Sequence, residues 1–297
     1  MKPPTLTLTL LALTGTATSE CTHAYLTNAA AQYVAAQRAG LTSIYTSPSI
    51  TYTENDVPLN ISSSILATPL KIDRATSYHD TTLCASFTEL IVTDPTNPYV
   101  IATRTVHDQT NSSLTTIHSI VSKPGDWAFN ATGYIRWENL EGPWDAIPPS
   151  KRDTRATIQA AGDAYFSHFN DTTIPVPWAT SCARIEGGAY TDSHGWGNNT
   201  CDGDVPGGNV VRNRRYVIDE VYGVVSIFVG FPRLDGTAPE RAVPDSHLFR
   251  VEGGRIRFVH TVSACFARGC GWVGDLPPNL GQGRRRRNLG VAAKAVA

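Results

Sequence analysis

The chain contains two copies of one pattern, and this internal repeat limits its possible folds more than any other feature. Two helix-like segments, residues 23–40 and 155–171, are each followed by strand-like stretches. Four pairs of landmarks keep the same order in both copies: Tyr33 with Tyr165, Glu54 with Glu186, Asp80 with Asp219, and His118 with His260. Their separation grows from 132 to 139 and then 142 residues, as insertions in the second copy would produce. We therefore predict the α+β class, with two tandem cone-shaped units, each a helical cover on a curved antiparallel sheet.

The segment that joins the two copies has the composition of a linker. Residues 141–153 contain three prolines and a glycine, which disfavour both helix and strand. Strand-like stretches are residues 49–54, 75–92, 99–108, 114–122 and 133–140 before the linker, and 216–231, 247–251 and 255–262 after it. The predicted organisation is a signal peptide (1–19), a first unit (20–140), the linker (141–153), a second unit (154–266) and a disordered basic tail (267–297). The alternative for the tail, which has four consecutive arginines, is a processing site.

Three features indicate the secretory pathway. Residues 1–19 have a positively charged start, a short apolar run and a small-residue cleavage site, as signal peptides do. The six cysteines are an even number, and Cys182 and Cys201 bracket a segment rich in glycine and asparagine, so we expect a disulfide between them. Five Asn-x-Ser/Thr sequons predict N-glycans at Asn60, Asn111, Asn130, Asn170 and Asn198. We therefore predict a secreted protein.

Charge and motifs argue against several classes of function. The formal net charge of −1 gives no sign of a nucleic-acid or membrane-surface partner. No later stretch reaches the roughly 18 apolar residues of a transmembrane helix. The sequence has no CxxC, HExxH, GxSxG or Walker motif, so we expect no metal and no cofactor. The assembly state stays open, with a homo-oligomer among the alternatives.

A histidine stands among apolar residues in the last predicted strand. Because strand side chains alternate between faces, His260 should lie on an inward, apolar face, and His118 has the matching place in the first copy. Such a histidine either transfers protons or is a hydrogen-bonded core residue. The residues in phase with His260 are Ile256, Phe258 and Val262.

Carboxylates supply the other candidates. Glu186 follows Arg184 by two positions on the same strand face, so the two form either a proton-transfer site or a structural ion pair. Asp219 lies inside an apolar strand, where a carboxylate needs a partner, and Arg214 or Arg215 is expected to supply it.

Four further stretches share a family likeness: SITYTEND (49–56), CARIEGGAYT (182–191), RRYVIDEVYGVV (214–225) and FRVEGGRIRFVHTV (249–262). They resemble the ketosteroid-isomerase-like superfamily, also called nuclear-transport-factor-2-like or SnoaL-like. Residues 21–265 as a whole resemble a fungal group of secreted proteins with two such units in tandem, similar to proteins found in biosynthetic clusters such as those for maleidrides. The resemblance implies a cone-shaped unit and places Glu54 and Glu186 where the family has its catalytic base. The family's oxyanion-hole donors find no secure match.

The expected function combines this resemblance with the residues. We predict a cofactor-independent enzyme of isomerase, cyclase or lyase type that performs acid–base chemistry on a small hydrophobic, polyketide-type metabolite, with dimerisation of maleic-anhydride monomers as one such reaction. The substrate class follows from the resemblance alone. Its catalytic residues would be Glu186, His260, Arg184, Asp219, Glu54 and His118, with Glu186 and His260 facing one cavity. The alternative is a non-catalytic secreted protein that binds a small ligand. An empty, polar cone favours the enzyme, and a cone filled by Phe and Trp side chains favours the binder or a structural role.

Overall fold

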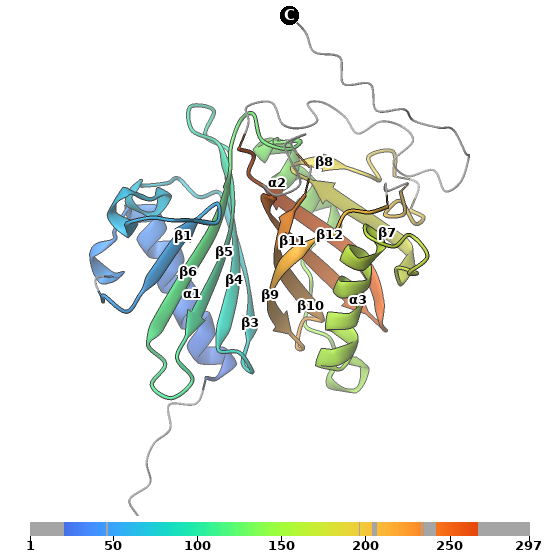
Figure 1. The fold of residues 1–297 in the computed structure, drawn as a ribbon, viewed down its shortest axis with the longest axis horizontal. Coiled ribbons are helices and arrows are strands. Elements are labelled where there is room, and N and C mark those ends of the chain that lie inside the picture. Colours follow the sequence, from blue (N-terminus) through green and yellow to red (C-terminus); the bar gives the residue numbers. More distant parts are fainter. Residues whose placement is uncertain are drawn as a thin grey trace, which may run out of the picture.

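The computed structural model describes residues 21–45, 47–195, 197–203, 207–232, 234 and 242–266. It contains two six-stranded mixed sheets and three α-helices, which confirms the predicted α+β class (Figure 1). The predicted signal peptide and basic tail lie outside the described residues. Within the described part, no helix combines the length and apolar character needed to cross a membrane.

The first half of the chain forms one sheet and two helices. Their bounds are α1 His23–Ala39, β1 Thr51–Glu54, β2 Val57–Pro58, β3 Arg74–Asp80, β4 Ala85–Val92, β5 Tyr99–His107, β6 Leu114–Ser122 and α2 Ala131–Glu141. The second half forms the other sheet and the third helix. Their bounds are α3 Arg155–His168, β7 Trp178–Glu186, β8 Ala189–Tyr190, β9 Arg212–Asp219, β10 Val224–Phe231, β11 Val243–Glu252 and β12 Arg255–Ser263. Short 3₁₀ turns are η1 Ser43–Tyr45, η2 Ile61–Ser63, η3 Ile65–Ala67 and η4 Pro149–Lys151.

Both sheets have the same topology. Their strand orders are β2-β1-β6-β5-β4-β3 and β8-β7-β12-β11-β10-β9. The predicted antiparallel pattern holds except at one place in each sheet, where β1 runs parallel to β6 and β7 parallel to β12. In this parallel pair Glu54 lies opposite Ser119, and Glu186 lies opposite Thr261. The register therefore matches the alignment of the two halves that the sequence predicts.

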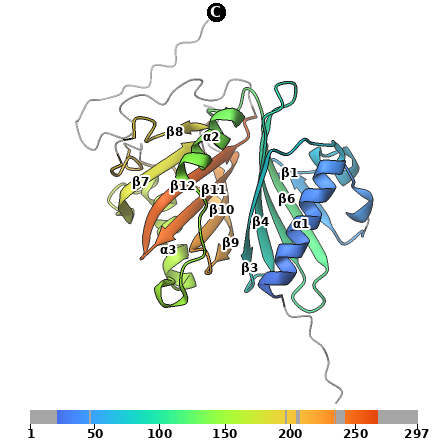
Figure 2. The same ribbon diagram turned by 180° about the vertical axis from the view of Figure 1, so that it is seen from behind.

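The helices and sheets form four layers. Helix α1 covers the outer face of the first sheet and α3 covers the outer face of the second, while the two inner faces meet (Figures 1 and 2). Each interface has its own apolar core: Leu90, Ile101 and Ile117 are buried on the α1 side, and Val225, Ile227 and Phe249 on the α3 side. We call the interface between the two inner faces the seam. Its core includes Phe87, Phe228 and Leu248.

Two buried aspartates join the sheets where β3 lies beside β9. The backbone N–H of Ile218 donates to Asp80 (2.9 Å), and the N–H of His79 donates to Asp219 (2.8 Å), so each sheet supplies the acceptor for the other. The start of α3 reinforces this contact between the sheets, because Arg155 donates two hydrogen bonds to Asp80 (2.8 and 2.7 Å). The edge strands β3 and β9 are therefore joined by hydrogen bonds to which both units contribute.

The segment 133–140, predicted as a strand, is instead part of helix α2. Its alternation of apolar and polar residues covers too few positions to specify a strand, and Asn130 provides a helix N-cap, since its side chain accepts a hydrogen bond from the N–H of Gly133 (2.8 Å). On a helix, Tyr134, Glu138 and Glu141 share one face. This face points at the seam, where it contributes to the site described below.

The predicted disulfide between Cys182 and Cys201 is confirmed. A second disulfide joins Cys21, at the start of α1, to Cys84, in the turn before β4. It fastens the first helix to its own sheet. All five sequon asparagines are exposed on the surface.

Candidate functional site

The side chain of His260 points into the seam. It extends from β12 toward the first sheet, and its ring lies against the rings of Trp144 (4.7 Å between centroids) and Tyr134 (5.7 Å). Phe258 and Val262 share this face, as predicted. Ile256 does not, because an irregularity in the register of β12 after Ile256 turns that residue toward α3.

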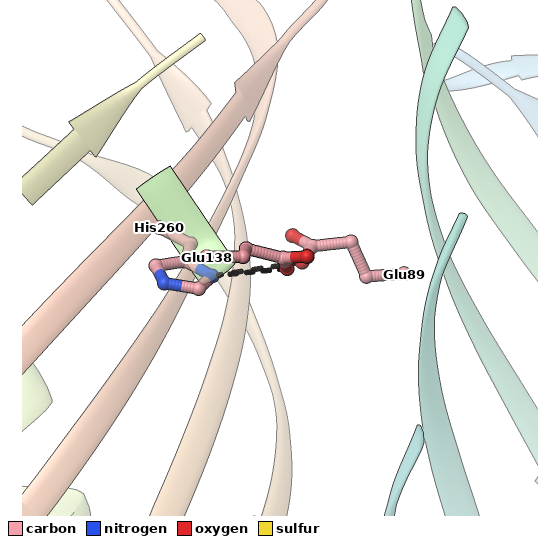
Figure 3. Close-up of side chains that lie close together, drawn as sticks. All are labelled: Glu89, Glu138 and His260. Atoms are coloured by element: carbon pink, nitrogen blue, oxygen red, sulfur yellow. Dashed lines mark ion pairs between the residues drawn. The ribbon is translucent and has the colours of Figure 1, made fainter. Parts of the chain in front are cut away.

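Three buried glutamates surround His260. Its Nε2 lies 2.9 Å from Oε2 of Glu141, and its Nδ1 lies 3.5 Å from Oε1 of Glu89 and 3.8 Å from Oε1 of Glu138. Figure 3 shows Glu89 reaching across the seam from β4 to meet Glu138 and His260. The cluster therefore draws its members from the first sheet, helix α2 and the second sheet.

A second ring of side chains holds each glutamate. Tyr134 donates to Oε2 of Glu89 (2.6 Å), Arg74 donates to Oε2 of Glu138 (3.2 Å), and the indole of Trp144 donates to Oε2 of Glu141 (3.3 Å). Each of these bonds fixes one carboxylate oxygen. The orientation of the carboxylates therefore does not depend on the histidine alone.

Burial and mutual charge shift the pKa values of the cluster in opposite directions. Burial and the neighbouring Glu89 carboxylate raise the pKa of Glu138 to about 9. Burial would also raise the pKa of Glu89, but its interaction with the nearby His260 outweighs burial and lowers that pKa. For His260, burial acts to lower the pKa, and the Glu141 and Glu89 carboxylates raise it well above its ordinary value. Without a bound cation, protons on Glu138 and His260 thus balance much of the negative charge of the three glutamates.

A cavity of about 70 Å³ adjoins the cluster. It is lined by Glu89, Glu138, Glu141 and His260 together with Arg74, Thr76, Tyr78, Trp144 and Leu248. The side chain of Arg74 is 34% exposed, so the cavity reaches solvent beside it. The space suits a few water molecules or a very small ligand.

Glu186 and His260 do not face one cavity, contrary to the prediction. Glu186 lies opposite Thr261, one residue after His260, and therefore on the other face of the sheet. There it accepts a hydrogen bond from Thr261 (3.1 Å) and pairs with Arg184 (3.4 Å). Arg184 in turn contacts the hydroxyl of Tyr165 on α3 (3.4 Å). The two residues belong to the interface between the second sheet and its helix.

His118, the counterpart of His260, also faces the seam but has different neighbours. Its Nε2 lies 2.7 Å from Asp56 and 3.3 Å from Arg215, and its ring lies 5.0 Å from that of Phe228. Burial lowers the pKa of His118. Burial would raise the pKa of Asp56, but hydrogen bonds from His118 and Arg215 lower it to about 2.

In the structure, the carboxylates of Asp219 and Glu54 accept hydrogen bonds from backbone N–H groups. Asp219 accepts from the N–H groups of His79, Val221 and Tyr222 and contacts His23 (3.3 Å), so its partner is not Arg214 or Arg215 as predicted. Those arginines bind Asp163 and Asp56 instead. Glu54 accepts from the hydroxyl of Tyr52 (3.0 Å) and from the N–H of Ile65 at the start of η3 (2.8 Å).

The two halves differ at the position of Glu89. In the first sheet Asp80 pairs with Ala85, and in the second Asp219 pairs with Val224, so the residue equivalent to Glu89 is Phe228. The seam thus contains His260 beside Glu89, and His118 beside both Phe228 and Asp56. The fold itself accepts an apolar residue at the position of Glu89, so this glutamate is not a requirement of the architecture.

The sequence analysis missed all three glutamates. Glu89 could have been noticed, because it is the single charged residue in ASFTELIV, a strand whose eight residues are all buried. Glu138 was hidden by the wrong strand prediction for residues 133–140, and Glu141 was assigned to the linker 141–153 although it is the last residue of α2. Only the helical spacing brings them to one face.

A groove beside α1 is the second candidate site. Two adjoining hollows of about 400 and 450 Å³ share Tyr45, Ser47 and Ile50 in their lining. One extends over Tyr25, Ala29, Tyr33, Ile44, His107 and Leu114, and the other over Tyr52, Leu59 and Ile61. Among the described residues of the second unit, aromatic rings fill the corresponding face: Phe166, Phe169, Trp178 and Phe249 pack around Tyr165.

The comparisons with known proteins concern mainly the second unit. Residues 151–263, less than half of the chain, match the model of a family described as a domain of unknown function (DUF8021). No curated protein and no solved structure matches the chain.

Proposed function

We propose that this is a secreted protein that binds a small apolar molecule in the groove between α1 and the first sheet. The main support is a difference between the two units. In the described part of the chain, the first unit leaves the space beside its helix open, whereas the second fills it with aromatic rings. The two hollows together have the size of a typical small-molecule site, and half of their lining residues are aromatic or aliphatic while the other half are polar. Ile44 and Leu59 are exposed at the groove, although apolar side chains are better buried.

The resemblance to the ketosteroid-isomerase-like superfamily supports this proposal. A helix laid over one face of a curved sheet, present twice, is the arrangement that the resemblance implies, and ligands in that family bind between the two. The exposed sequon asparagines and the two disulfides support secretion. On this proposal the second unit acts as a structural partner of the first.

Acid–base turnover of the bound molecule is a second candidate, and one pair of residues favours it. The hydroxyl of Tyr25 lies 2.9 Å from Nδ1 of His107, and both residues line the groove. Burial lowers the pKa of His107 and so favours its neutral imidazole, the form that a general base requires. The isomerase or cyclase chemistry expected for a polyketide-type substrate would then use His107 and Tyr25 rather than Glu186 and His260.

Binding is tested with the apolar fluorophore 1-anilinonaphthalene-8-sulfonate. An Ala29→Trp substitution places a large ring in the groove and should weaken binding by about tenfold or more. The control is Leu140→Trp, which adds the same ring at an exposed site on α2, away from the groove. Equal affinity of the wild type and Ala29→Trp would contradict the proposal.

Turnover is tested separately with a β,γ-unsaturated ketone, whose conversion to the conjugated isomer is followed by ultraviolet absorbance. His107→Gln should keep fluorophore binding and lose isomerisation. If the wild type binds the fluorophore but isomerises no ketone, binding without catalysis is the better description.

A further inference from the structure

Three metal-binding atoms converge in the seam. Oxygen atoms of Glu89 and Glu138 and a nitrogen of His260 all lie within 4.8 Å of one another (Figure 3). Two ligands bound to one ion at about 2.1 Å with a tetrahedral angle lie roughly 3.4 Å apart. The 3.5 and 3.8 Å separations from Nδ1 of His260 are close to that value. Small side-chain adjustments would therefore bring all three atoms onto one ion.

In each of these three side chains, the second oxygen or nitrogen, which we call the outer atom, already has a polar partner. Tyr134 holds Oε2 of Glu89, Arg74 holds Oε2 of Glu138, and Glu141 lies 2.9 Å from Nε2 of His260. A carboxylate on the far nitrogen of a histidine favours a proton there and directs the lone pair of the near nitrogen to a metal. The inner atoms, Oε1, Oε1 and Nδ1, are the ones left facing each other.

Two of these inner atoms form a loose ion pair with each other and no hydrogen bond. Oε1 of Glu89 and Nδ1 of His260 lie 3.5 Å apart in side chains that are only 2% and 5% exposed, and neither has a partner with hydrogen-bond geometry. Buried polar atoms without hydrogen bonds are costly, and a cation placed between the inner atoms would give both a direct bond. This observation is independent of the count of acidic residues.

The equivalent position in the other half shows that the scaffold does not need an acid at the position of Glu89. There Phe228, the counterpart of Glu89, lies against His118. A buried carboxylate that the fold can replace by a phenyl ring calls for a role other than folding.

We propose that Glu89, Glu138 and His260 bind one divalent transition-metal ion, with Glu141, Tyr134 and Arg74 as its supporting shell. One imidazole and two carboxylates suit Zn²⁺, Mn²⁺ or Co²⁺ better than Ca²⁺, which takes oxygen ligands throughout. Three protein ligands leave at least one coordination position for water, and the adjoining 70 Å³ cavity provides the space. This site is separate from the groove and does not depend on the function proposed for it.

The test is isothermal titration calorimetry of untagged, chelator-treated, full-length protein with Zn²⁺ and with Mn²⁺, and visible absorption with Co²⁺. The wild type should bind one equivalent, and Glu89→Gln or His260→Ala should weaken binding by about 100-fold or more. Glu141→Gln, which removes only the supporting carboxylate, should weaken it by about 10- to 100-fold. The matched control is His118→Ala, which removes the equivalent histidine and should bind like the wild type.

Two results would overturn the proposal. One is a wild type that binds none of the three ions at millimolar concentration. The other is binding that survives in Glu89→Gln and His260→Ala, which would locate the ion elsewhere. Near-ultraviolet circular dichroism checks that each variant is folded. If Glu89→Gln fails that check, Glu141→Gln decides the question, and unchanged affinity in that variant contradicts the proposed shell.

Discussion

Replacing Asp80 by alanine should destabilise the whole molecule, because this carboxylate belongs to both units. It accepts two hydrogen bonds from Arg155 and one from the buried N–H of Ile218 in the other sheet. Loss of the acceptor leaves the Ile218 N–H unpaired, at about 1–3 kcal/mol. The Arg155 guanidinium, whose side chain is one quarter exposed, adds about 1–2 kcal/mol after solvent screening. We therefore expect Asp80→Ala to lower the free energy of unfolding by about 2–5 kcal/mol.

The measurement is chemical denaturation at pH 7, followed by tryptophan fluorescence. Glu252→Ala serves as the control, because it also removes a carboxylate bound to an arginine, but one that is half exposed, and should cost about 1 kcal/mol or less. Similar values for the two variants would refute the reasoning. Two separate unfolding transitions in Asp80→Ala, with one unchanged, would show that the second sheet does not depend on this contact.

Two further predictions concern pH and backbone geometry. Asp56 has a pKa of about 2 in the folded protein, below its ordinary 3.8, so its stabilising effect should be complete above pH 4 and disappear as the pH falls toward 2. The difference in unfolding free energy between the wild type and Asp56→Asn should therefore shrink over that range. A difference that stays constant would argue against the ion pair. Gly187 and Gly253 have the same left-handed φ, near +60°, but a Cβ at Gly187 would lie 2.2 Å from the carbonyl oxygen of Trp127, whereas one at Gly253 meets nothing within 4 Å. Thermal or chemical unfolding should therefore show a loss of about 1–2 kcal/mol for Gly253→Ala and a clearly larger loss for Gly187→Ala, and equal losses would contradict the close approach.

Much of the fold could be predicted from the sequence because its signals are local. Apolar alternation located most strands, and the ordered landmarks of the two copies gave Glu54 and Glu186 equivalent positions. The prediction for residues 133–140 was wrong for a physical reason: the alternation there is too short to specify a strand, and the cap at Asn130 and the packing of Tyr134 against both sheets favour a helix. Tertiary contacts outweighed the local pattern there.

The candidate site could not be predicted in the same way. Strand parity correctly gave His260 an inward face, but parity cannot say which layer lies opposite that face. The prediction placed His260 in the cavity of its own unit together with Glu186, and the structure shows the first sheet opposite it. The partners Glu89 and Glu141 come from elements that reach His260 only through the packing of one unit against the other.

The difference between Glu89 and Phe228 has a consequence for how such a molecule can change over time. In a symmetric dimer of identical subunits, every substitution at the interface is made twice, so a costly charged cluster on one side must be accepted on the other. Covalent linkage of two copies removes that constraint, because each copy is encoded by its own codons. Here Phe228 lies against His118 in one half, while its counterpart Glu89 joins Glu138 and Glu141 around His260 in the other. A fused pair of copies can thus carry a charged cluster in one half of a repeated interface without repeating it in the other.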